Sequence, residues 1–189
     1  MSFIEHTKQF IQTKDTDILD LLMSTKSQLV IEYLWSECLR DLEALEILLQ
    51  EESLDPSYNN CELLLDAVLA PNALKFLLED ERMDPCSRDS QCLFEAAEWD
   101  VESVKLLLED GRVDPTMRDS ECLRVAAQHD SDCLKMILED GRADPGAKNS
   151  LCIGIAAEHN PKSFMLLLED GRAIEAIRHR QRLSLQDAE

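Results

Sequence analysis

Three kinds of side chain that could do chemistry recur in the second half of the chain. Cysteines lie at the 30-residue spacing of Cys92, Cys122 and Cys152. A ring side chain recurs in the same way, at Trp99, His129 and His159, and a basic one at Arg88, Arg118 and Lys148. Thiols and imidazoles are common zinc ligands, and a thiol near an imidazole can act as a nucleophile. Whether these thiols and imidazoles bind zinc or act as nucleophiles depends on where the secondary-structure elements place them.

These recurrences belong to an internal repeat of the whole sequence. Asp-Pro pairs begin at Asp55, Asp84, Asp114 and Asp144, at spacings of 29, 30 and 30 residues. Residues 84–113 and 114–143 are identical at 16 of 30 positions, in register and without a gap. A fixed period of this length is typical of solenoids, which are built from stacked repeats.

Each repeat contains two apolar stretches with helical spacing. The first is Cys92-Leu93-x-x-Ala96-Ala97, with equivalents at 122–127 and 152–157. The second runs from Val104 to Leu108, with equivalents at 134–138 and 164–168. Both predict helices that are buried on one side. A helix of about 9–10 residues is unstable alone in water, so we expect neighbouring repeats to support one another.

Polar residues and glycines mark the expected helix ends. Capping oxygens for the first helix are available from Asp89-Ser90, Asp119-Ser120 and Asn149-Ser150. The second helix is preceded by Asp100, by Asp130 or Ser131, and by Asn160. A glycine that could adopt a left-handed conformation follows it, at Gly111, Gly141 and Gly171. Side-chain oxygens and glycines at these places predict helix starts and ends, respectively.

We expect one domain over residues 1–189. Its parts are a degenerate N-terminal cap (1–26), repeats at 27–54, 55–83, 84–113, 114–143 and 144–173, and a C-terminal capping helix or tail (174–189). Within the cap, Phe3–Ile11 and Ile18–Met23 form an eroded helix pair by the same spacing. Terminal repeats are expected to diverge because one of their faces lies in water.

The units resemble ankyrin repeats, in which about 33 residues form a turn and two antiparallel helices. The resemblance is carried by Leu93-x-x-Ala96-Ala97 and its equivalents, by the leucine runs and by the aspartate that opens each unit. The segment 106–115, Leu-Leu-Leu-Glu-Asp-Gly-Arg-Val-Asp-Pro, is similar to divergent ankyrin repeats of large DNA viruses and protists. The resemblance covers residues 27–173 and implies an all-α, ankyrin-like α-solenoid of stacked antiparallel helix pairs.

The sequence departs from the ankyrin pattern in two respects. The family's Thr-Pro-Leu-His is replaced by Gln-Cys-Leu-Phe at 91–94 and by Glu-Cys-Leu-Arg at 121–124. The stretch between Asp-Pro and the first helix is also about three residues short of the family length. We therefore expect ankyrin-like helices joined by stunted β-hairpin loops.

This architecture makes the cysteines and histidines poor candidates for chemistry. Packed helices lie about 8–10 Å apart, whereas a disulfide needs Cα atoms within about 7 Å and a metal ligand must lie about 2 Å from its ion. The seven cysteines are an odd number and include no CxxC pair. We interpret Cys92, Cys122 and Cys152 as small, buried, reduced residues, and we expect no metal and no cofactor.

The varying positions of the first helices are the candidate partner-binding residues. In ankyrin-like proteins the position of Trp99, His129 and His159 lies on the concave, partner-facing side; packing over the interhelix turn is the alternative. The full candidate set is Arg88, Gln91, Glu98, Trp99, Arg118, Glu121, Gln128, His129, Lys148, Glu158 and His159. Variation inside a constant frame is typical of a binding surface, although drift on a solvent-exposed face would give the same pattern.

Acidic pairs end the second helices, at Glu109-Asp110, Glu139-Asp140 and Glu169-Asp170. Carboxylates are unfavourable at the C-terminal end of a helix. Arg112, Arg142 and Arg172 follow these pairs and could neutralise them along the stack. The alternative is an acidic strip that attracts a basic partner.

Net charge restricts the class of partner. Lys and Arg total 19 against 39 Asp and Glu, for a formal net charge of −20. Such a surface repels phosphate backbones and anionic lipids, so we expect neither nucleic-acid nor membrane binding. No apolar run approaches the roughly 18 residues of a membrane helix, and no secretory signal is recognisable at the N-terminus. We expect a cytoplasmic monomer.

No catalytic signature accompanies these features. The sequence has no GxSxG motif, no Gly-rich phosphate loop and no local Cys–His pairing. We therefore expect no enzyme but a non-catalytic protein–protein interaction module that binds a partner protein on the concave face. One alternative is an adaptor that docks a client protein to a larger complex through the basic segment 178–182 or through residues 1–23. A third hypothesis is an unrecognised enzyme or cation-binding protein.

Overall fold

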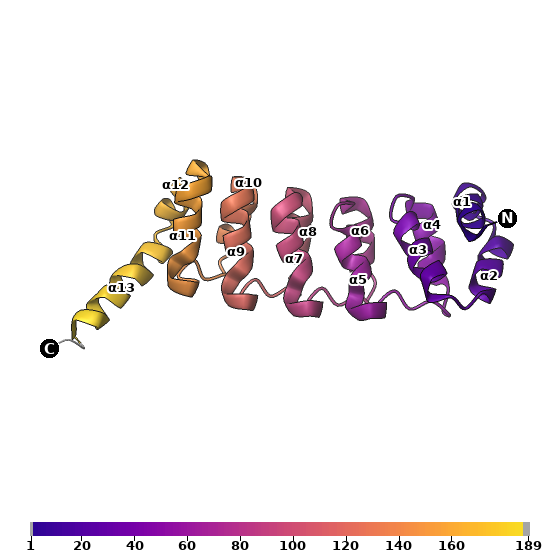
Figure 1. Ribbon diagram of the computed structural model, residues 1–189, viewed down its shortest axis with the longest axis horizontal. Helices are drawn as coiled ribbons and strands as arrows, with labels where there is room; N and C mark the ends of the chain where they lie inside the picture. The colour runs from indigo at the N-terminus through magenta and orange to yellow at the C-terminus, as the bar shows by residue number, and fades with distance from the viewer. Residues whose placement is uncertain (1, 187–189) are drawn as a thin grey trace. The chain divides into compact units, whose positions relative to one another are not determined.

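The computed structural model describes residues 2–186, except for the side chains of 149, 180 and 183–186. The described residues form thirteen α-helices and no β-strand, which confirms the all-α fold class (Figure 1). The chain divides into two compact units, Met1–Asp84 and Pro85–Glu189. Their boundary lies at the Asp-Pro pair that opens the predicted repeat 84–113.

The first unit consists of three consecutive helix pairs. They are α1 (Phe3–Thr13) with α2 (Thr16–Ser24), α3 (Gln28–Cys38) with α4 (Leu42–Gln50), and α5 (Tyr58–Ala67) with α6 (Pro71–Leu78). Helix α3 contacts both α1 and α5, while α4 contacts α6. The eroded N-terminal helix pair expected from sequence is confirmed as α1 and α2.

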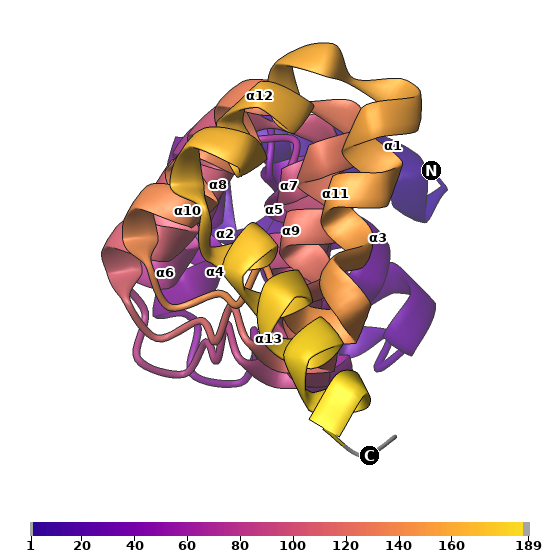
Figure 2. The same ribbon diagram turned by 90° about the vertical axis from the view of Figure 1, so that its left-hand side faces the viewer.

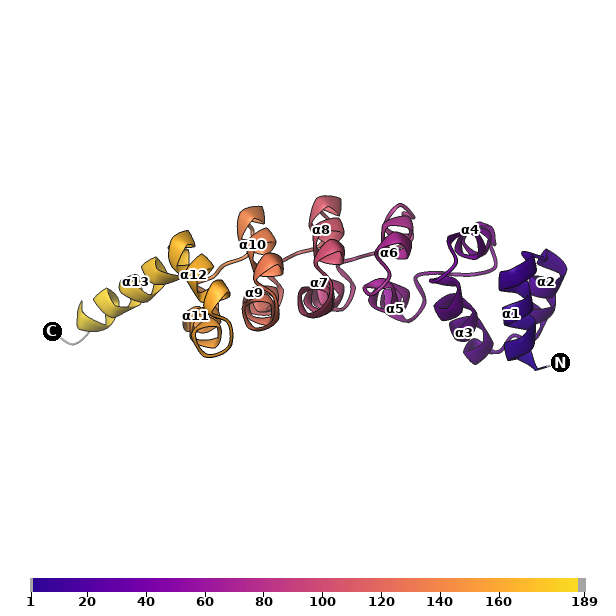
Figure 3. The same ribbon diagram turned by 90° about the horizontal axis from the view of Figure 1, so that it is seen from above.

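The second unit contains three further pairs and a final helix. The pairs are α7 (Ser87–Trp99) with α8 (Val101–Asp110), α9 (Met117–His129) with α10 (Ser131–Asp140), and α11 (Ala147–His159) with α12 (Pro161–Asp170); α13 spans Arg172–Gln186. Helix α9 packs between α7 and α11, and α10 between α8 and α12. Within this unit the first helices therefore form one layer and the second helices another (Figures 2 and 3).

The second helices begin and end where the sequence predicts. Asp100, Asp130 and Asn160 are their N-caps, and each side chain accepts a hydrogen bond from a backbone N–H of the first turn. Gly111, Gly141 and Gly171 end them in the left-handed conformation, with φ of 78°, 80° and 77°. A left-handed residue at a helix C-terminus is accessible to glycine without steric cost.

The apolar positions shared by the repeats form the core of the second unit. Ala96 and Ala126 are fully buried on the first helices, as are Leu107, Ile137 and Leu167 on the second helices. Small alanines allow adjacent first helices to approach closely, and the larger aliphatic side chains fill the space between the two layers. Burial of these positions explains why they repeat while their neighbours vary.

The final helix, α13, packs against only part of the last helix pair, α11 and α12. A Cβ added to Gly146, which precedes α11, would lie 2.7 Å from the Cβ of Ala176 on α13. At the other end of α11, Ala157 is exposed, although its equivalents Ala97 and Ala127 are fully buried. Glycine at 146 is thus what allows α13 to pack against the start of α11.

Candidate interaction surfaces

Each first helix of the second unit contains a left-handed turn just after its first residue. Arg88, Asp89 and Ser90 have φ of 54°, 58° and 57°, and residues 118–120 repeat this conformation. Left-handed backbone costs an L-residue roughly 1–2 kcal/mol, so such a turn needs compensating contacts. In the described residues this turn occupies the place where the sequence predicted a stunted hairpin.

The serine at the end of each turn supplies such a contact. Ser90 Oγ accepts a hydrogen bond of 3.0 Å from the backbone N–H of Asp114, and Ser120 Oγ one of 2.8 Å from that of Asp144. Ser150 Oγ donates to the carbonyl of Ala173 at 3.0 Å. The prediction that Ser90 and Ser120 cap their own helices is wrong. The left-handed turn directs the hydroxyls of Ser90 and Ser120 at the start of the next repeat, and that of Ser150 at Ala173 in α13.

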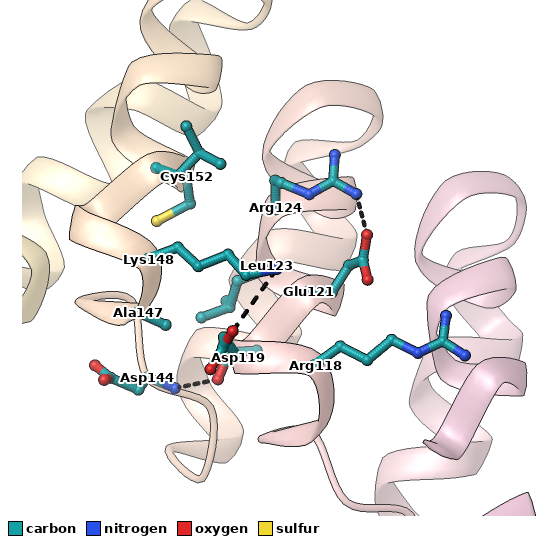
Figure 4. A pocket seen from close by; sticks show the side chains of 11 residues that line it. Arg118, Asp119, Glu121, Leu123, Arg124, Asp144, Ala147, Lys148 and Cys152 are labelled. Carbon is teal, nitrogen blue, oxygen red and sulfur yellow. Dashed lines mark hydrogen bonds and ion pairs between the residues drawn. The ribbon is translucent and has the colours of Figure 1, made fainter. Parts of the chain in front are cut away.

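The basic row before the first helices is paired along the repeats. Arg118 Nε lies 3.5 Å from Asp89 Oδ2, and its guanidinium carbon 5.1 Å from the ring centre of Phe94. Lys148 Nζ lies 3.7 Å from Asp119 Oδ2, as the dashed line in Figure 4 shows. In both cases a cation of one repeat reaches an aspartate of the preceding repeat. Exposed pairs of this kind contribute about 0–1 kcal/mol each.

A small cleft between α9 and α11 lies beside these ion pairs (Figure 4). Its lining includes Arg118, Glu121 and Lys148 from the predicted set, together with Arg124, whose guanidinium binds the Glu121 carboxylate. The free space is about 20 Å³, which holds one or two water molecules. The cleft therefore has no room for a small-molecule ligand.

The eleven predicted binding residues lie near the two ends of the first helices. Near the start of α7, α9 and α11 lie Arg88, Gln91, Arg118, Glu121 and Lys148; near the end lie Glu98, Trp99, Gln128, His129, Glu158 and His159. The two groups are roughly 12 Å apart along the helix axes, at 1.5 Å per residue. We refer to the second group as the ring-bearing row.

The ring side chains of the ring-bearing row are exposed on regular helices. Trp99 is 64% exposed, and His129 and His159 are exposed as well. His159 Nε2 lies 3.9 Å from the carboxylate of its neighbour Glu158. A tryptophan exposed to this degree at the end of α7 does not pack over the interhelix turn, which leaves its ring available for contact.

The acidic ends of the second helices are held by arginine forks. Arg142 donates from Nε and Nη2 to Asp140 at 2.8 and 2.9 Å, and from Nη1 to the carbonyl of Val113 in the preceding repeat at 2.9 Å. Arg172 makes the same kind of fork with Asp170 and lowers the pKa of that carboxyl. The arginine two residues later thus neutralises the charge of each of these aspartates, while the glutamate before each aspartate remains exposed.

The cysteines behave as buried packing residues. All seven, which lie in the described residues, are free thiols, and Cys92, Cys122 and Cys152 are buried. Their Sγ atoms donate to the carbonyls of Pro85, Pro115 and Pro145 at 3.2–3.3 Å. Burial raises the pKa of Cys122 to about 12 and that of Cys152 to about 11. Thiols with such pKa values are not nucleophilic near neutral pH.

Neither a metal site nor a membrane-spanning helix occurs among the described residues. No group of three or more His, Cys, Asp or Glu side chains there is arranged to hold a metal ion. None of the described helices has both the length and the apolar character needed to cross a bilayer.

A larger groove lies in the first unit, at residues that the sequence reasoning did not select. It has a volume of about 330 Å³ and lies between α3 and α5. Its lining residues are Leu29, Glu32, Tyr33, Ser36, Tyr58, Asn59, Glu62 and Asp66. We refer to it as the α3–α5 groove. One sequence signal could have identified it: position 59 is asparagine where the later repeats have Arg88, Arg118 and Lys148.

Comparisons with known proteins do not assign the chain to a family. No family model, no curated protein and no solved structure matches it.

Proposed function

We propose that the chain is a non-catalytic protein–protein interaction module whose repeats stack as an ankyrin-like solenoid. The partner is a protein that binds the layer of first helices on its concave face, across the ring-bearing row. The free thiols fit a reducing compartment such as the cytoplasm.

The observation that carries this proposal is the exposed ring of Trp99 at the end of α7, 64% accessible, in line with His129 and His159. Tryptophan is among the residues most enriched at the energetic centres of protein interfaces. The positions around this row are constant from repeat to repeat because their side chains are buried or form hydrogen bonds and ion pairs with a neighbouring repeat. The row itself differs from repeat to repeat, as a surface shaped for one partner would.

The test is affinity capture from native lysate with the full chain as bait, followed by quantification of the captured proteins. The double variant Trp99→Ala/His129→Ala is compared with Lys105→Ala/Lys135→Ala, which changes two exposed side chains on the second helices α8 and α10. A partner that is lost with the first variant and retained with the second supports the proposal. A partner retained equally by both variants refutes this location of the site.

A further inference from the structure

The last helix pair, α11 and α12, has an outer face that no further pair covers. In the second unit α9 and α10 pack on α7 and α8, and α11 and α12 pack on α9 and α10 in turn. An Asp-Pro pair opens each of these repeats, but Ile174-Glu175 stands at the next equivalent position, and the chain continues directly into α13. Helix α13 packs against the start of α11, which it crosses in Figure 2. The second half of α11 thus lacks the neighbour that α7 and α9 have.

Three core positions of the repeat are accessible on this outer face. Ala157 is exposed, and Ile153 and Phe164 are partly exposed. The equivalent residues of the two preceding repeats are at most 1% exposed, because the following helix pair covers them. These equivalents are Ala97 and Ala127 for Ala157, Leu93 and Leu123 for Ile153, and Val104 and Leu134 for Phe164.

Two sequence changes make the outer face more apolar than the faces before it. Lys105 lines the side of α8 that is turned towards α10, whereas the equivalent residue of α12 is Met165, which is 54% exposed. Arg124 lines the side of α9 that is turned towards α11, and Gly154 replaces it on α11. A terminal repeat normally has a polar outer face, because that face lies in water. This outer face is apolar instead, and we refer to it as the α11–α12 end face: Ile153, Gly154, Ala157, Phe164 and Met165.

The packing of α11 on α9 shows which chemistry fits such a face. The cleft between these helices is lined by Leu123 from α9 and by Cys152 from α11, among other residues. Cys152 and Ala156 are 5% and 0% exposed, and their spacing of four residues places them on one side of α11. Small side chains on that side allow α11 to approach α9 closely. A helix with small residues four positions apart is therefore complementary to the end face as well.

We propose that the α11–α12 end face binds an α-helix of a partner protein whose contact side carries small apolar residues four positions apart. The bound helix lies along the second half of α11, as α11 lies along α9, and Phe164 and Met165 of α12 complete the contact. Binding removes from water the apolar atoms that the preceding repeats bury against their neighbours. A second copy of the chain fits less well, because its own end face presents large side chains and each copy has a net charge of −20.

The probe is a fluorescein-labelled peptide that copies residues 151–160, with Cys152→Ala to prevent oxidation. A hydrocarbon staple between positions 154 and 158, on the side of the helix opposite 152 and 156, keeps this short peptide helical. Fluorescence anisotropy against the full chain should show saturable binding. The same peptide with Ala156→Glu should bind about tenfold more weakly, because it buries a carboxylate without a partner. Absence of binding, or equal affinity of the two peptides, would overturn the proposal.

Ala157→Lys/Met165→Lys in the full chain tests the location of the site. Both side chains are exposed, and lysine already occupies the positions equivalent to Met165 in the preceding repeats, so this variant is expected to fold. The matched control is Leu29→Lys/Leu69→Lys, which gives the same charge to two apolar residues of the first unit that are 74% and 71% exposed. We expect about a tenfold loss of peptide affinity in the first variant and less than about a twofold change in the control. Far-UV circular dichroism and thermal unfolding verify that both are folded, and equal affinities of the two variants would refute the location.

Hydrogen exchange of the full chain with saturating peptide provides an independent readout. Bound peptide should slow amide exchange within residues 153–165, and protection confined to another segment would contradict the proposal. Concentration-dependent self-association that Ala157→Lys/Met165→Lys abolishes would make a second copy the occupant and rule out the assignment to a partner protein. Trp99→Ala/His129→Ala should leave peptide affinity unchanged, because the ring-bearing row belongs to the other proposal. Failure of one proposal is therefore distinguishable from failure of the other.

Discussion

The hydrogen bond between Ser120 and the next repeat allows a quantitative test of how the repeats support one another. Ser120 is 4% exposed, has φ of 57°, and accepts from the backbone N–H of Asp144 at 2.8 Å. Ser120→Ala keeps the strained backbone and leaves this N–H without its partner. We expect a loss of about 1–2 kcal/mol in the free energy of unfolding, the usual cost of one such bond with partial access to water.

Two other substitutions at Ser120 separate the hydrogen bond from the strain. Cys61 occupies the equivalent place in the first unit, where its Sγ accepts from the Asp84 N–H at 3.3 Å, so Ser120→Cys should retain most of the stability. Ser120→Gly also loses the bond but relieves roughly 1–2 kcal/mol of left-handed strain, which the greater entropy of unfolded glycine partly offsets. The predicted order of stability is Ser, Cys, Gly, Ala.

The measurements are urea unfolding followed by circular dichroism and hydrogen exchange of the Asp144 amide. A loss of about 1.4 kcal/mol corresponds to a tenfold rise in an opening equilibrium constant, so protection of this amide should fall about tenfold in Ser120→Ala. The reasoning is refuted if Ser120→Ala is as stable as the unchanged chain, or if glycine is less stable than alanine at this position.

Three further predictions concern packing, thiols and the groove. Gly146→Ser would place its Cβ 2.7 Å from the Cβ of Ala176, so proteolysis should release α13 more readily. In Gly154→Ala the added Cβ meets nothing within 4 Å, so this variant should stabilise α11 by about 0.5–1 kcal/mol. Equal proteolysis of the two variants would contradict this prediction. Under native conditions an alkylating reagent should label only the half-buried Cys86 rapidly, because the other six thiols are buried, and mass spectrometry counts the labels. The raised pKa of Asp66 means that its ionisation destabilises the fold, and this destabilisation is complete above the folded-state pKa. Asp66→Asn should therefore raise Tm at pH 7 and have little effect at pH 3. A lower Tm of this variant at pH 7 would refute the prediction.

Helix positions and ends were predictable because local physics determines them. Spacing of apolar residues located the helix pairs, and Asp100, Asp130 and Asn160 cap their helices as side-chain chemistry requires. The left-handed glycines were predictable for the same reason: one residue type accepts that backbone without cost. All of these features depend on a few neighbouring residues.

The roles of the serines and basic residues depend on contacts between repeats, which local patterns do not contain. A serine before a helix normally predicts an N-cap, but three consecutive left-handed residues turn Ser90 and Ser120 toward the following repeat. The reach of Arg118 back to Asp89 likewise requires knowing how far apart successive turns lie.

The groove was missed for a different reason, and this bears on how repeat sequences are interpreted. Aligning the units emphasises what they share, and positions 88, 118 and 148 then define a basic row. The informative residue is Asn59, because it is uncharged. At the equivalent position the later repeats have a cation, which pairs with an aspartate of the preceding repeat. Glu32, Glu62 and Asp66 line the groove beside Asn59. Function in such a chain is therefore best sought where a repeat departs from its frame at the cost of its own stability.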